Sequence, residues 1–172
     1  MHRLKYSTDM VQRALQKSEA LGSLNHSITG GAGNFAGYMG EECISHFLGA
    51  DNVSCDEGDD KFNYDLIYNG YTIEVKTKRR TVDPKDFYDV SIAKTSTHQK
   101  PDVYAFVSIT KNRGKVGFNN VWLCGFMGCK EFFDSAVFHK KGSIDHQNNF
   151  KVHRDMYNMR ISDLYIDLED IL

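Results

Sequence analysis

The chain has 172 residues, of which 41% are hydrophobic and 26% are charged, and its formal net charge is −2. This length and composition predict one globular domain, and the balanced charge excludes a polycation that binds nucleic acid without specificity. Because no apolar stretch is long enough to span a bilayer and the first residues lack the apolar core of a secretory signal, we expect a cytoplasmic protein with no membrane partner.

The N-terminal part predicts two helices. Apolar residues recur at helical spacing over Thr8–Leu21, just before a glycine. A glycine-rich stretch, residues 30–34, is expected to form a loop, and it lacks the Lys-Ser/Thr pair of a phosphate-binding P-loop. The stretch Phe35–Leu48 predicts the second helix, and a short strand is expected around Val53.

The segment Tyr64–Thr77 carries the strongest local signal in the chain. Runs of β-branched and aromatic residues flank Asn69-Gly70, which is typical of a two-residue hairpin. With this turn the numbers of paired residues sum to 139, so Asp65 faces Glu74. Because side chains alternate along a strand, one face of the hairpin carries four polar residues: Asp65, Thr72, Glu74 and Lys76.

The C-terminal half predicts more strands and a third helix. A weakly alternating strand and two nearly continuous apolar strands are expected over residues 87–93, 102–110 and 121–127. Residues 130–138 look helical, residues 140–149 look like a polar loop, and the tail from Arg160 places apolar residues against the core: Ile161, Leu164, Ile166, Leu168 and Ile171. The order of elements predicts a single α/β domain over residues 1–172, with a core of about 35–138 between an N-terminal helix and a C-terminal extension.

Two carboxylates that oppose each other across a sheet are destabilising unless something lies between them. A hard divalent cation would relieve the repulsion between Asp65 and Glu74, and Lys76 points to the same side. The helix before the hairpin offers a third acid, either Glu41 or Glu42, and Glu41 shares its face better with the apolar residues Ile44 and Leu48. The alternative is a solvated polar face, with both glutamates favouring the helix dipole.

These residues resemble the motifs of the PD-(D/E)XK nuclease superfamily, which includes many restriction endonucleases, lambda-exonuclease-like enzymes and archaeal Holliday junction resolvases. The acids come in the same order: Glu41 on a helix, Asp65 on one strand, and Glu74-Val75-Lys76 on the next. Gly40-Glu41 before an apolar helix is a common form of the first motif, and the resemblance covers about residues 35–127. Tyr64 stands where the name of the motif has proline, a position that is often replaced.

The resemblance implies a restriction endonuclease-like fold, with a central mixed β-sheet flanked by helices, and a metal-dependent DNA nuclease of either the endo or the exo kind. It implies that Asp65, Glu74 and the carbonyl of Val75 bind Mg²⁺ or Mn²⁺, with Glu41 as a direct or water-mediated ligand. The cation would polarise the scissile phosphate and lower the pKa of a bound water. Lys76 would orient that water or stabilise the developing negative charge.

A basic run follows the candidate site. We expect it to contact DNA phosphates without reading bases, and its members are Lys78, Arg79 and Arg80, with Arg113 and Lys115 as further candidates. The alternative is a solvated strand end. Gln99 lies near the place where some relatives carry a Gln or Lys in the site, so we expect it in a supporting role, with an ordinary polar loop as the alternative.

Other functions stay open at this point. A catalytically silent module that binds DNA or a protein, and an RNA-processing nuclease, can both use the same scaffold. The sequence does not indicate whether the substrate is single-stranded, duplex or branched DNA. A homodimer would suit cleavage of a duplex, and a small stand-alone nuclease would suit a phage or mobile element. The four cysteines include no Cys-x-x-Cys pair, which favours reduced thiols over a zinc site.

Overall fold

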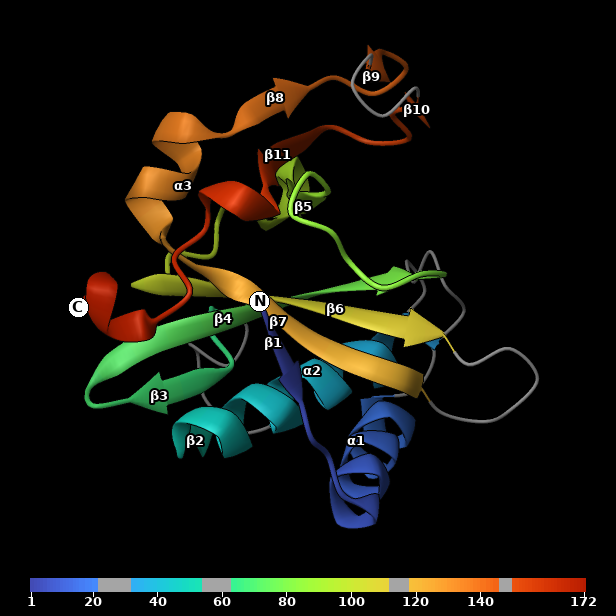
Figure 1. The fold of residues 1–172 in the computed structure, drawn as a ribbon, viewed down its shortest axis with the longest axis vertical. Coiled ribbons are helices and arrows are strands. Elements are labelled where there is room, and N and C mark those ends of the chain that lie inside the picture. The colour runs from blue at the N-terminus through green and yellow to red at the C-terminus, as the bar shows by residue number, and fades with distance from the viewer. Residues whose placement is uncertain (22–31, 54–62, 112–117, 146–149) are drawn as a thin grey trace.

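The computed structural model describes residues 1–21, 32–53, 63–111, 118–145 and 150–172 (Figure 1). In these ranges the helices are α1 (Thr8–Leu21), α2 (Ala32–Leu48) and α3 (Cys129–Ser135), with 3₁₀ turns at Lys94–Ser96, Ile161–Asp163 and Leu168–Asp170. The strands are β1 (His2–Leu4), β2 (Asp51–Asn52), β3 (Leu66–Tyr68), β4 (Tyr71–Arg80), β5 (Asp89–Ala93), β6 (Val103–Lys111), β7 (Phe118–Gly128), β8 (Val137–His139), β9 (Ile144–Asp145), β10 (Phe150–Lys151) and β11 (Met156–Arg160).

A six-stranded mixed sheet is the centre of the fold, in the order β1-β7-β6-β4-β3-β2. The pair β4 and β6 is parallel, and the other neighbours are antiparallel. The apolar strands β6 and β7 lie inside this sheet, which explains why they read as nearly continuous hydrophobic runs. The prediction of a mixed α/β fold is therefore confirmed.

Helices α1 and α2 cover one face of the main sheet (Figure 1). A single apolar cluster joins both helices to this face, with Ala14, Met39 and Ile44 on the helix side and Ile73, Val75, Ala105 and Val107 on the sheet side. Gly40 lets α2 approach β4 closely, because a Cβ atom at this position would lie 2.1 Å from Oγ1 of Thr77. The glycine is thus required by packing between the helix and the strand.

A second, smaller layer covers the opposite face. Its three antiparallel strands form a small sheet in the order β5-β11-β8, and α3 lies beside them (Figure 1). A second apolar cluster joins this layer to the main sheet: Val90, Ile92, Tyr104, Phe106, Cys124, Met127, Phe132, Met159, Ile161 and Leu164. The sequence did not predict this sheet, because its strands are short and come from distant parts of the chain.

Several boundaries differ from the predictions. The loop predicted over residues 30–34 is helical from Ala32 onward. The third helix ends at Ser135, and the following residues form β8, in which Val137 and Phe138 are exposed. The predicted loop 140–149 contains β9, and in the tail Ile166 is exposed while Leu168 is buried.

Some predictions fall on residues outside the described ranges, namely Arg113, Lys115 and the first part of the glycine-rich loop. Within the described ranges, no helix is both long enough and apolar enough to cross a membrane.

Candidate active site

The hairpin that carries the candidate acids has the predicted register. Leu66 pairs with Ile73, so the paired residue numbers sum to 139. Asn69 and Gly70 have φ angles of 50° and 83°, and positive values at both positions are what a type I′ turn requires.

Asp65 lies one residue before β3, outside the regular ladder, so the predicted cross-strand pair with Glu74 is not formed. The backbone N–H of Asp65 donates to the carbonyl of Ile73 at 2.9 Å, and its carboxylate Oδ2 accepts from the N–H of Val75 at 2.8 Å. The N–H group of Val75 needs an acceptor, and β3 does not extend far enough to offer a backbone carbonyl. The carboxylate of Asp65 takes the place of that carbonyl. The N–H and C=O of an extended residue point the same way, so the Val75 carbonyl is directed toward Asp65 as well.

Glu74, Lys76 and Gln99 form a closed triangle of hydrogen bonds. Nζ of Lys76 donates to Oε1 of Glu74 and to Oε1 of Gln99, both at 2.7 Å. Nε2 of Gln99 donates to the same Glu74 oxygen at 2.9 Å. The hydroxyl of Tyr104 donates to the backbone carbonyl of Gln99 at 3.2 Å, which helps to hold the segment before β6. The structure thus brings these three predicted residues together.

The acids of this region are crowded in a poorly hydrated place. Burial raises the pKa of Asp65 well above its ordinary range, and the negative charges of Glu41 and Glu74 raise it further. Burial also raises the pKa of Glu74, although the nearby ammonium of Lys76 and the hydrogen bond from Gln99 act in the opposite direction. A positive charge brought among these carboxyl groups would therefore be strongly favoured.

The two adjacent glutamates of α2 have different environments. Glu42 is paired with α1: its Oε2 accepts from Nε of Arg13 at 2.7 Å, and its Oε1 lies 3.3 Å from Nζ of Lys17. Glu41 is buried as well, and its charge acts on Asp65. This arrangement favours Glu41 over Glu42 as the third acid of the site.

The residues present fit a hard divalent cation in their chemistry. Carboxylate and carbonyl oxygens are the ligands that Mg²⁺ accepts in proteins. Oε2 of Glu74 is buried and has no hydrogen-bond partner within the described part of the chain, so it has an unused acceptor. In that same part of the chain, no three His, Cys, Asp or Glu side chains are arranged as a metal site. The other oxygen of Glu74, Oε1, accepts a hydrogen bond from Lys76.

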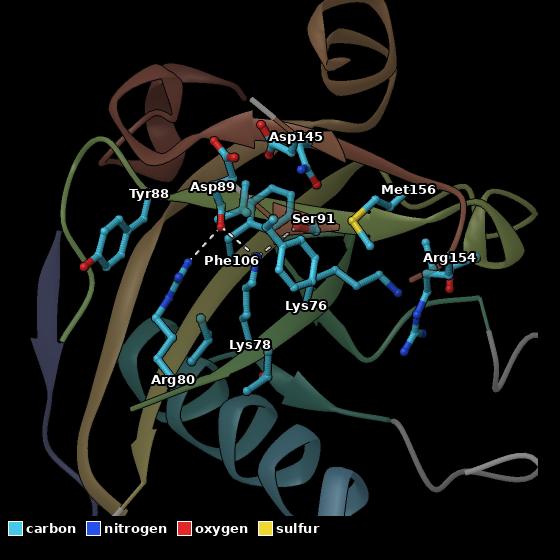
Figure 2. A pocket seen from close by; sticks show the side chains of 17 residues that line it. Lys76, Lys78, Arg80, Tyr88, Asp89, Ser91, Phe106, Asp145, Arg154 and Met156 are labelled. Carbon is cyan, nitrogen blue, oxygen red and sulfur yellow. Dashed lines mark hydrogen bonds between the residues drawn. The ribbon is translucent and has the colours of Figure 1, made fainter. Parts of the chain in front are cut away.

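Strand β4 divides the basic run between two faces. Lys76, Lys78 and Arg80 line a cavity of about 630 Å³ whose other walls include residues of β5 and β11. Figure 2 shows the side chains around it. Arg79 is exposed, and the alternation of side chains places it on the face of α2. The three residues Lys78, Arg79 and Arg80 therefore do not form one continuous basic surface.

The two basic side chains deep in this cavity are held by β5. Nζ of Lys78 donates to the backbone carbonyl of Asp89 and to Oγ of Ser91, both at 3.1 Å, and Nη2 of Arg80 donates to the same carbonyl at 2.8 Å (Figure 2). Burial lowers the pKa of Lys78 to about 8, and the charge of Arg80 contributes in the same direction. Nε of Arg80 also donates to Ser108 of β6 at 2.9 Å.

Sequence reasoning missed the remaining walls of the cavity. They come from β5 and from the segment that includes Phe150, Arg154 and Met156, which lies between the predicted loop 140–149 and the predicted tail from Arg160. In that segment, the cluster of basic and aromatic residues was the sequence feature that could have indicated a binding surface. Two of the cysteines contact hydroxyl groups: Sγ of Cys124 donates to Oγ of Ser108 at 3.2 Å, and Sγ of Cys129 lies 3.8 Å from the hydroxyl of Tyr104.

Comparisons with known proteins add no relative to this picture. No protein-family model matches the chain, and no curated protein matches its sequence.

Proposed function

We propose that the chain is a divalent-metal-dependent nuclease of the PD-(D/E)XK type, with a restriction endonuclease-like core, that hydrolyses phosphodiester bonds in DNA. One observation carries the proposal most directly: the triangle of Glu74, Lys76 and Gln99 lies beside Asp65, whose pKa is raised by burial and by two neighbouring acids. A nuclease of this type needs a lysine next to a cluster of acids, and buried acids that repel one another are costly without such a use.

Each residue has a role in the proposed reaction. Asp65, Glu74, the Val75 carbonyl and Glu41 would hold the cation, which when bound supplies Lewis-acid polarisation of the scissile phosphate and a more acidic water. Lys76 presents its ammonium group to the negative charge that develops on the phosphate oxygens. Gln99 keeps that ammonium in place, because its Oε1 accepts a hydrogen bond from Nζ of Lys76 at 2.7 Å.

Cleavage assays test the proposal. Single-stranded, duplex and branched DNA, together with RNA, are incubated with the wild-type protein in Mg²⁺, Mn²⁺ or EDTA. We expect DNA hydrolysis with either metal and none with EDTA. Asp65→Asn, Glu74→Gln and Lys76→Met should each lower the rate by roughly a hundredfold or more, the usual cost of removing a catalytic acid, base or charge-stabilising group.

The adjacent glutamates of α2 provide a matched control. Glu41→Gln should lose most of the activity, whereas Glu42→Gln should keep it, because Glu42 pairs with Arg13 and Lys17 of α1. Circular dichroism checks that every variant is folded. Cleavage that persists in Asp65→Asn and Lys76→Met would contradict the proposal. Binding of DNA without cleavage would instead indicate a silent binding module, and cleavage of RNA alone would indicate an RNA-processing enzyme.

A further inference from the structure

The size of the cavity beside the candidate active site bears on which form of nucleic acid could enter it. Its volume of about 630 Å³ is in the range of pockets that enclose a small molecule. A duplex keeps its bases inside the stack, so a base reaches such a pocket only after it has left the stack. A strand whose bases are already unpaired enters at no such cost.

The charges around the cavity favour a phosphate backbone. Lys76, Lys78 and Arg80 stand at alternate positions of β4, so their Cα atoms follow one another at about 6.6 Å along the strand. The head groups of Lys78 and Arg80 converge on the carbonyl of Asp89, and they therefore concentrate two positive charges in one part of the cavity. Arg154 adds a fourth basic side chain from the opposite wall (Figure 2). Arg154 is exposed and makes no hydrogen bond or ion pair with another described residue, so its guanidinium is available to a ligand.

The lining also includes acids and apolar groups. Asp89 of β5 and Asp145 of β9 also line the cavity, and the side chain of Asp145 is buried. Carboxylates are acceptors for the amino groups of bases. Phe150 is 46% exposed, and its ring lies 5.2 Å from that of His153. An exposed ring beside a row of cations is the combination with which proteins hold single strands.

We propose that this cavity binds unpaired nucleotides, so that single-stranded nucleic acid is the form that the protein holds. The backbone follows Lys76, Lys78 and Arg80, Arg154 contacts a phosphate from the other wall, and a base stacks on Phe150. The inference rests on the proposed function for the position of the scissile phosphate next to Lys76. Binding itself is independent of cleavage, so the two can fail separately.

Fluorescence anisotropy in EDTA tests the inference without cleavage. Short labelled oligonucleotides of mixed sequence are compared as single-stranded DNA, single-stranded RNA and duplex DNA. We expect the full-length protein to bind a single strand roughly tenfold or more tightly than the duplex. Phe150→Ala should weaken single-strand binding by roughly fivefold or more, which is the lower end for loss of one base–aromatic stack. Arg154→Ala should weaken it too and should reduce the salt dependence by about one phosphate contact.

Two matched controls lie outside the lining of the cavity. Phe47 of α2 is 47% exposed and packs against a histidine, His2, at 5.8 Å, as Phe150 packs against His153. Arg3 of β1 is exposed, as Arg154 is. Phe47→Ala and Arg3→Ala should leave binding unchanged. Equal or tighter binding of the duplex, no binding of any oligonucleotide, or cavity variants that behave like these controls would overturn the inference. Retained single-strand binding by a protein that does not cleave would contradict the proposed function alone.

Discussion

Two neighbouring side chains on one helix show how little sequence separates a structural acid from a candidate catalytic one. Consecutive helix residues point about 100° apart, so Glu41 and Glu42 cannot face the same partner. Glu42 meets the two cations of α1, and Glu41 acts on Asp65 across the helix–sheet contact. The sequence favoured Glu41 by its apolar face, but the pairing of Glu42 with Arg13 depends on how the two helices pack.

The buried charge of Lys78 lowers the stability of the folded protein, and raising the pH removes this effect. Burial lowers its pKa to about 8, whereas an exposed lysine titrates near 10.4. The groups that face it are Arg80, Asp89, Cys124 and Asp145. Below about pH 8 the folded protein holds a charged, desolvated ammonium, and between pH 8 and 10.4 the unfolded chain binds more protons than the folded one. Stability should therefore rise with pH across this window.

Urea unfolding of wild type and Lys78→Met, followed by fluorescence, measures this effect. The variant should be more stable at neutral pH, and the difference should shrink by an amount on the order of 3 kcal/mol between pH 8 and 10.4. The carbonyl of Asp89 keeps the donor of Arg80 in the variant, so it is not left unpaired. Parallel stability curves for the two proteins over this window would contradict the prediction.

At the scale of elements, the contact between α2 and β4 determines where Glu41 lies. Gly40 precedes Glu41, and an added Cβ would lie 2.1 Å from Oγ1 and 3.3 Å from Cβ of Thr77. Oγ1 of Thr77 is itself buried with no hydrogen-bond partner within the described residues. The two elements are therefore as close as a glycine and a threonine allow.

Gly40→Ala should destabilise the protein by roughly 1–3 kcal/mol, because α2 or Thr77 must move to relieve the overlap. Gly37→Ala is the matched control: its Cβ would meet nothing within 4 Å, so the better helix propensity of alanine should stabilise by up to about 1 kcal/mol. Adding Thr77→Ala to Gly40→Ala removes the atom at 2.1 Å and should recover part of the loss. Chemical denaturation of the four members of the cycle measures the coupling. Additive effects would mean that the overlap is not the cause.

The same elements show what a sequence can and cannot predict. Asn69-Gly70 determines its own turn and hence the register of Leu66 with Ile73, because the information is local. The position of Asp65 was predicted less well, since its carboxylate binds the backbone of Val75 instead of continuing the ladder. Strand β5 pairs with β11, which lies far along the chain, and alternation in either strand does not name its partner. The cavity depends on that pairing, so its far wall was not predicted.

At the scale of the whole molecule, the main sheet separates two environments. One face is apolar and covered by helices, and the other carries the triangle of Glu74, Lys76 and Gln99, the cavity and the small sheet (Figure 1). The chain leaves the main sheet after β4 and enters the small sheet at β5. Asp83 lies in this connection and binds side chains of β6 and β7. Its Oδ1 accepts from Thr110 at 2.7 Å, Asn120 at 2.9 Å and Trp122 at 3.1 Å.

This attachment should weaken in acid. Hydrogen bonds from Asn120 and Thr110 hold the pKa of Asp83 below its ordinary value, so its contribution to stability is present above about pH 4 and is lost as pH falls through the lowered value. Asp83→Asn should cost about 1 kcal/mol at neutral pH, as expected for hydrogen bonds that remain exposed to water, and the two proteins should become equally stable at low pH. The chain has one tryptophan, Trp122, whose Nε1 donates to Asp83, so its fluorescence in the folded protein should titrate in wild type and not in the variant. If the difference in stability between wild type and Asp83→Asn persisted unchanged in acid, the charge of the Asp83 carboxylate would not be what stabilises the connection between β4 and β5.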